Sequence, residues 1–85
     1  MKVKVLFFAG LREQLGTSGE EIELPRDVTT VAGLRSFLSQ RGNSWKSALS
    51  EPKLIRTAVN QDMVQQGAPI KAGDEVAFFP PVTGG

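Results

Sequence analysis

The sequence predicts a small α+β domain, in which strand pairs pack on one main helix, followed by a short extended tail. Apolar residues alternate with period two near both ends of the chain, which is typical of strands. One central segment repeats its apolar residues at helical spacing instead. The chain has 85 residues, of which 40% are apolar and 22% charged. This length and balance fit one ordinary globular domain and are too small for two.

The opening segment, residues 2–9, is predicted to be a central strand. Three apolar residues share one of its faces by alternation: Val3, Val5 and Phe7. Leu6 and Phe8 follow on the other face. We therefore expect the second half of this strand to be covered on both sides, with these two side chains in the core rather than at an interface.

A helical turn and a second strand come next. Residues 10–16 form the predicted turn, which a glycine closes. Residues 20–24 alternate again, with Ile22 and Leu24 inward, and Pro25 ends them. The two strands are close enough in sequence to pair as a hairpin.

The one long helix is predicted to begin after Thr29 or Thr30, since either side chain can serve as the N-cap. Its apolar stripe comprises Val31, Leu34, Phe37 and Leu38. Gly42 is placed to supply a left-handed residue beyond the end of the helix. A stripe of this kind needs a sheet to cover.

The rest of the chain supplies a short helix and the remaining strands. We expect a helix over residues 44–49, a strand over 54–60, a turn and brief return strand over 60–64, a turn over 71–74 and a last strand over 75–79. This order is that of the β-grasp, or ubiquitin-like, fold, in which the first and last strands lie side by side in a mixed sheet. It divides the chain into a β-grasp domain, residues 1–79, and an extended C-terminal tail, residues 80–85.

The composition excludes several classes of function. The chain contains no cysteine and no histidine, so it has no cysteine nucleophile, no Cys/His zinc site and no Ser-His-Asp triad. We expect no bound metal or cofactor, and a reducing cytoplasm is the expected location. A net charge of +1 without a basic run argues against nucleic-acid binding. No apolar run approaches the roughly 20 residues that span a membrane, and no signal-peptide pattern opens the chain.

No charged side chain follows Glu75, so the end of the last strand and the whole tail are uncharged up to the terminal carboxylate. Pro80 and Pro81 fix two φ angles and favour an extended path away from the domain. At about 3.3 Å per residue, the tail reaches at most ~20 Å, which is far enough to enter a neighbour's pocket. Gly84 and Gly85 have no side chains, so the end can thread a narrow channel.

The terminal carboxyl of Gly85 is the only credible covalent sulfur site on the chain. Activation with ATP would convert this poor electrophile into an acyl adenylate, and a sulfur donor could then displace AMP to leave a thiocarboxylate. Such chemistry needs no catalytic side chain on the carrier. It needs an accessible terminal glycine and other proteins that catalyse each step, so Gly85 is the predicted reacting residue.

Three segments of the sequence resemble the small subunits of molybdopterin synthase. They are residues 4–9 with Arg12, Glu13 and Gly16, residues 58–61, and the ending 73–85 with its Phe78-Phe79-Pro80-Pro81 and Gly84-Gly85 runs. The resemblance covers nearly the whole chain, in order and at family length, and the ending is its most specific part. It implies a β-grasp sulfur carrier for molybdenum cofactor biosynthesis.

The resemblance also implies partners and a reaction. An adenylating enzyme that resembles ubiquitin-activating E1 would use ATP to activate Gly85, and sulfur transfer would make the thiocarboxylate. The tail would then insert into the large synthase subunit, where two sulfur deliveries to cyclic pyranopterin monophosphate build the dithiolene. The catalytic side chains would belong to the partners, in a heterotetramer. The implied partner-binding residues of the tail are Pro80, Pro81, Val82, Thr83 and Gly84.

Individual side chains near the tail allow finer predictions. Phe78 and Phe79 face opposite ways by alternation, so one belongs to the core and the other is a candidate partner contact; we favour Phe79. Met63 is expected to be ordinary packing, and the roles of Arg12 and Glu13 stay open. Four basic residues are expected to be solvated surface charges rather than groups that steer an acidic partner toward the chain: Lys2, Lys4, Arg35 and Arg41.

Two other functions fit much of the same pattern. A sulfur carrier for another pathway, such as thiamine synthesis, would share the fold and the Gly-Gly ending, but the Phe-Phe-Pro-Pro lead-in argues against it. A protein modifier would use the same end to form isopeptide bonds to lysines. A noncovalent ubiquitin-like module would not need the terminus at all.

Overall fold

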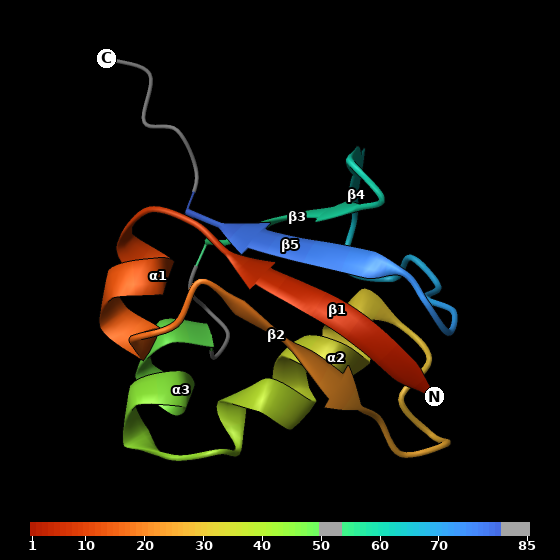
Figure 1. Cartoon of the computed structure of the whole chain (residues 1–85), viewed down its shortest axis with the longest axis horizontal. Helices are drawn as coiled ribbons and strands as arrows, with labels where there is room; N and C mark the ends of the chain where they lie inside the picture. The colour runs from red at the N-terminus through yellow and green to blue at the C-terminus, as the bar shows by residue number, and fades with distance from the viewer. Residues whose placement is uncertain (50–53, 81–85) are drawn as a thin grey trace.

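The computed structural model of the chain describes residues 1–49 and 54–80. Its elements run β1 (Lys2–Phe7), α1 (Gly10–Leu15), β2 (Gly19–Glu23), α2 (Val31–Ser39), α3 (Asn43–Leu49), β3 (Arg56–Val59), β4 (Asp62–Val64) and β5 (Glu75–Phe79) (Figure 1). These confirm the predicted elements, with ends shifted by no more than a residue or two. No helix in the described part of the chain is long and apolar enough to cross a membrane.

The strands form one mixed sheet in the order β2-β1-β5-β3-β4. β1 pairs in parallel with β5, while the other neighbouring strands pair antiparallel. The first and last strands therefore lie side by side at the centre of the sheet, as Figure 1 shows. This is the predicted β-grasp arrangement.

The core lies between the sheet and helices α2 and α3. The apolar stripe of α2 faces it, since Val31, Leu34 and Leu38 are all fully buried. Two aromatic side chains of the central strands stack there, with the ring centroids of Phe7 and Phe78 6.2 Å apart. The Trp45 ring of α3 meets Phe7 edge-on at 5.5 Å. Burial of these side chains removes their apolar area from water, and this stabilises the fold.

Helix α2 begins as predicted and ends differently. The Gly33 amide donates to Thr30 Oγ1 at 3.1 Å, which satisfies one free donor of the first turn. The helix stops at Ser39, before Gly42, so the predicted left-handed end at that glycine is wrong. Gln40 instead keeps a right-handed conformation, and its amide bonds back to the Phe37 carbonyl at 3.4 Å. Hydrogen bonds to the carbonyl three residues back, as in a 3₁₀ turn, can end a helix without a left-handed residue.

The prediction that the second half of β1 is covered on both sides is wrong. Helices α2 and α3 lie on one side of the sheet (Figure 1), and Leu6 is only half-buried while Phe8 is 46% exposed. Both residues lie on the same side of the strand as Lys2 and Lys4, which are exposed. The described chain supplies a single layer of helices, so it leaves this second face of the sheet open.

Arg35 also departs from its predicted place at the surface. It lies in the middle of α2 and is 6% exposed. Its Nε donates to the carbonyl of Leu49, at the end of α3. A guanidinium is tolerated there because this bond satisfies part of its donor set. Arg35 therefore links α2 to α3 and is not a solvated surface charge.

Candidate functional site

The tail leaves the domain from the end of a strand that is paired on both sides. β5 is hydrogen-bonded to β1 on one edge and β3 on the other, and Phe79 lies opposite Arg56. Pro80 follows and has no amide N–H to extend the ladder. The root of the tail is thus held by the centre of the sheet. The other predicted tail residues lie outside the described part of the chain, and their roles stay predictions: Pro81, Val82, Thr83, Gly84 and Gly85.

The two phenylalanines before the tail lie on opposite faces of the sheet. Phe78 is fully buried and belongs to the core. Phe79 is half-buried and lies on the face away from the helices. The role of Phe79 as a partner contact stays a prediction, but its ring is accessible where the ring of Phe78 is not.

Around Phe79 the face of the sheet away from the helices, here called the open face, carries several apolar side chains together with the exposed Arg56, which lies opposite Phe79. The strand register places four side chains in one row across it: Leu6, Ala77, Ala58 and Met63. The two alanines have short side chains, so the middle of the row projects less from the sheet than its two ends. Met63 at its end is 55% exposed, and Phe8, which follows β1 by alternation on the same face, is 46% exposed. Exposed apolar side chains gathered in this way mark interaction surfaces.

The opposite end of the open face is charged. Lys2 lies opposite Glu23 and Lys4 opposite Glu21, which are favourable cross-strand pairs. The Met1 ammonium lies 3.0 Å from Glu23 Oε2 and lowers the pKa of that carboxyl through a hydrogen bond and its charge. The open face therefore changes from charged to apolar along β1 and β5, and its apolar end is the end from which the tail leaves.

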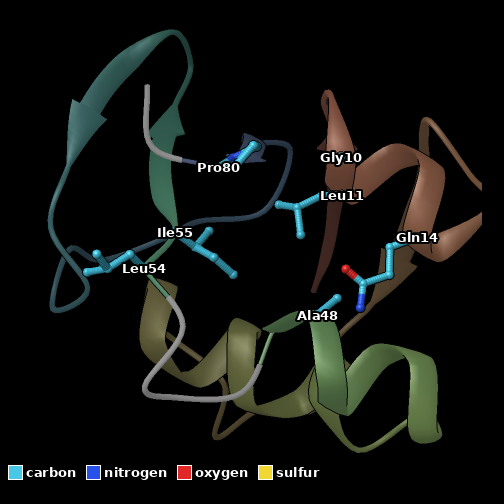
Figure 2. Close-up of a pocket in the computed structure, with 7 residues that line it drawn as sticks. All are labelled: Gly10, Leu11, Gln14, Ala48, Leu54, Ile55 and Pro80. Carbon is cyan, nitrogen blue, oxygen red and sulfur yellow. The ribbon is translucent and has the colours of Figure 1, made fainter. Parts of the chain in front are cut away.

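A pocket borders the root of the tail on the other side of β5. Its volume is about 210 Å³, and it lies between α1, the end of α3 and the segment before β3 (Figure 2). The lining residues are Gly10, Leu11, Gln14, Ala48, Leu54, Ile55 and Pro80. The pocket and the tail therefore share Pro80.

The exposed apolar residues near the tail root were not predicted from the sequence. Phe8 had a usable signal, because it has the same strand parity as Lys2 and Lys4, whose charges already indicated a solvent-facing side. Leu54 is 80% exposed and had no such signal, since it precedes β3 and has no periodic partner. Predicting it required the tertiary position of that segment.

Comparison with known proteins gives one consistent family. The model of the ThiS family matches residues 5–85 of the chain. The molybdopterin synthase sulfur carrier subunit of Escherichia coli (strain K12) is 48% identical over 83 residues, which cover 98% of this chain and 99% of that protein. The protein of the same name from Haemophilus influenzae is 45% identical with the same coverage.

Solved structures show the same fold. SAMP1 from Haloferax volcanii matches all of both chains with a TM-score of 0.80 and 28% identity. A complex of subunits 1 and 2 of the molybdopterin-converting factor from Helicobacter pylori contains a chain that matches with a TM-score of 0.69 and 27% identity, again over the whole of both chains.

Proposed function

The chain belongs to the ThiS family as a molybdopterin synthase sulfur carrier subunit, and on this premise we propose that Gly85 carries the sulfur as a C-terminal thiocarboxylate. The observation that supports this most directly is the position of the tail root. Pro80 follows a central strand that is paired on both edges, so the domain holds the root of the tail at a fixed point. A carrier needs this arrangement to present its end to one partner after another.

The proposed reaction runs through the terminal carboxyl. A carboxylate oxygen of Gly85 attacks the α-phosphorus of ATP on an adenylating enzyme, and pyrophosphate leaves. A sulfur donor then displaces AMP from the acyl adenylate, which leaves the thiocarboxylate. The thiocarboxylate sulfur displaces an oxygen substituent from a carbon of cyclic pyranopterin monophosphate to form a thioester. Water then hydrolyses the thioester, which leaves the thiol on the pterin and restores the Gly85 carboxylate, and two such deliveries complete the dithiolene. ATP is a substrate of the activating enzyme, and the chain itself supplies the sulfur and the arm that carries it.

We further propose that the large synthase subunit binds the apolar end of the open face and receives the tail. Phe79 and Phe8 offer accessible apolar surface beside the point where the tail begins, and Met63 extends this surface across the face on β4. Interfaces are enriched in aromatic residues, methionine and arginine, and this end of the face fits that description, since Arg56 lies opposite Phe79. The subunit 1 and 2 complex of the Helicobacter pylori factor supports a partner of this kind. The heterotetramer, the catalytic side chains in the large subunit and the cytoplasmic location remain parts of the proposal.

Intact-mass spectrometry tests the chemistry. The chain is incubated with its activating enzyme, ATP and a sulfur donor, and replacement of one terminal oxygen by sulfur adds ~16 Da. A reaction without ATP is the control, because the carboxylate is not activated there. If complete reactions with an active enzyme never produce the heavier species, the sulfur-carrier proposal fails.

A protein modifier is the second candidate, because the fold matches that of SAMP1, whose name in the Methanosarcina acetivorans structure is small archaeal modifier protein 1. A modifier would form isopeptide bonds between Gly85 and lysines of other proteins. Tagged chain recovered from its native cells separates the two functions. Capture of the large synthase subunit supports the carrier, whereas covalent ladders that resist denaturant support the modifier. Capture of a thiazole synthase instead would move the carrier to another pathway.

A further inference from the structure

Two of the three large exposed apolar side chains of the described residues lie at the end of the sheet from which the tail leaves, and the third, Met63, is level with the middle of β5 on the outer strand β4. The other two are Phe8 and Leu54. Phe8 and Met63 belong to the open face, whereas Leu54 lies on the other side of the tail root, at the edge of the pocket (Figure 2). At 80% exposure, Leu54 contributes little to the core. Apolar surface therefore borders the tail root on both sides of β5.

The pocket beside Leu54 is small and apolar. Leu11 and Ala48 form part of its lining and are 6% and 3% exposed, so its inner wall is fixed by the core. Gln14 provides a polar group, and its Nε2 is 3.5 Å from Ser47 Oγ. None of the lining residues in the described part of the chain carries a charge. An apolar group that contacts these residues would not strip water from an unpaired ion.

The size of the pocket indicates what it can hold. Its volume of about 210 Å³ is below the range of roughly 300–1,000 Å³ that is usual for small-molecule sites. It is suited to one aliphatic or aromatic side chain of another protein. Binding energy at interfaces is concentrated in anchors of this kind, which fill well-packed pockets.

We propose that this pocket receives one apolar side chain of the large synthase subunit, and that Leu54 packs against the same segment of that subunit. This inference rests on the proposed function. Pro80 lines the pocket and begins the tail, so a protein that draws the tail into its own site must bring its surface to the rim of the pocket. The pocket is thus continuous with the open-face contact proposed above, and the large subunit holds the tail root from both sides of β5.

The large subunit is the chosen occupant because it has to hold the tail throughout sulfur transfer. An anchored side chain slows dissociation, since changes in affinity act mostly through the dissociation rate. A pocket that serves retention therefore suits the synthase partner.

Two variants test the proposal by different means. Leu54→Ser removes the exposed rim contact. Gly10→Leu adds an apolar side chain to a residue that lines the pocket, and a Cβ at Gly10 would meet no described atom within 4 Å. We expect each to weaken binding of the large subunit about tenfold or more, mainly by faster dissociation, with an unchanged thermal midpoint. Lys46→Ser on α3 is the control: it shortens an exposed side chain that does not line the pocket.

The binding data distinguish the inference from the function on which it rests. Unchanged dissociation of the large subunit from both variants overturns the pocket proposal and leaves the carrier function standing. Slower thiocarboxylate formation by the activating enzyme, with normal binding to the large subunit, also overturns it and assigns the pocket to that enzyme. If the unmodified chain binds no large subunit, the proposed function itself fails.

Discussion

Phe78 and Phe79 are neighbours in β5 but lie on opposite faces of the sheet: the ring of Phe78 is fully buried against Phe7, and the ring of Phe79 is half-buried on the open face. One strand therefore ends with a residue that stabilises the domain and a residue that is available to a partner. The tail begins at the next position. This alternation separates stability from recognition within two residues.

Alanine substitutions at the two positions should have opposite effects. Phe78→Ala leaves a cavity in the core and should lower the free energy of unfolding by about 3–5 kcal/mol. Phe79→Ala should lower it by about 1 kcal/mol and weaken large-subunit binding by at least tenfold. Urea unfolding and calorimetric titration measure the two quantities. A larger loss of stability from Phe79→Ala than from Phe78→Ala would reassign Phe79 to the core.

Deletion of Gly85 should abolish sulfur loading without unfolding the domain. The buried core of the described residues lies entirely within positions 3–78, so we expect the domain to fold without the last glycine. The deleted chain should show no gain of ~16 Da in the activation assay and should keep the thermal midpoint of the full chain. Thr83→Ser is a suitable control, because it alters the tail and keeps the terminal glycine. A deleted chain that is unfolded would contradict this division between domain and tail.

Much of the fold could be predicted because its signals are local. Alternation in β1 and β5, the helical stripe of α2 and the N-cap at Thr30 each depend on a few neighbouring residues. The open face could not be predicted in the same way. Whether Phe8 is covered depends on which side of the sheet receives the helices, and that is decided by contacts between distant segments. Arg35 illustrates the same limit, since its partner Leu49 lies 14 residues away.

The candidate site likewise contains residues that could be predicted from local sequence and residues that depend on tertiary structure. Gly85 and the prolines could be proposed from the chemistry of a slim, uncharged end. The pocket beside Pro80 combines α1, α3 and the segment before β3, and no single stretch of sequence contains its pattern. Leu54 gains its significance only from that arrangement.

Asn60 should be difficult to replace. This gives a structural reason why residues 58–61 resemble the same segment of molybdopterin synthase small subunits. Its φ is 50°, in the left-handed region, and its side chain accepts from the Glu75 amide and donates to Asp74, both at 3.0 Å. Asn60→Gly loses the bonds and keeps the conformation. Asn60→Ala loses both and should be less stable than Asn60→Gly by a further ~1 kcal/mol. Trp45 fluorescence during urea unfolding measures this order, and equal stability of the two variants would contradict it.

Arg35→Met should destabilise the packing of α3 on α2. The substitution keeps an unbranched apolar stem but removes the donor to the Leu49 carbonyl. A hydrogen bond from a charged donor contributes about 1.5–3 kcal/mol, so the free energy of unfolding should fall by that order. Arg26→Met, at an exposed position, is the control. Equal unfolding midpoints for the two variants would show that the buried guanidinium does not hold the helices together.

The ion pair between the Met1 ammonium and Glu23 should make a small part of the stability depend on pH. The folded-state pKa of Glu23 is lowered, first by the hydrogen bond from that ammonium, then by its charge and by the charge of Lys2. A lowered carboxyl pKa contributes stability that is fully present above the unfolded-state pKa. This contribution is lost as the pH falls through the folded-state pKa, because the protonated carboxyl no longer attracts the ammonium.

Glu23→Gln tests this sign. The variant should be slightly less stable than the original chain near neutral pH, and the difference should shrink as the pH is lowered from about 7 to about 3. Glu21→Gln, on the same face of β2 but opposite Lys4, is the matched control. Carboxyl NMR titration of Glu23 measures its pKa directly, and chemical unfolding at each pH measures the stability. Because Glu23 is exposed, high salt should reduce the difference. A stability difference that grows as the pH falls would show that the ammonium does not stabilise the folded carboxylate.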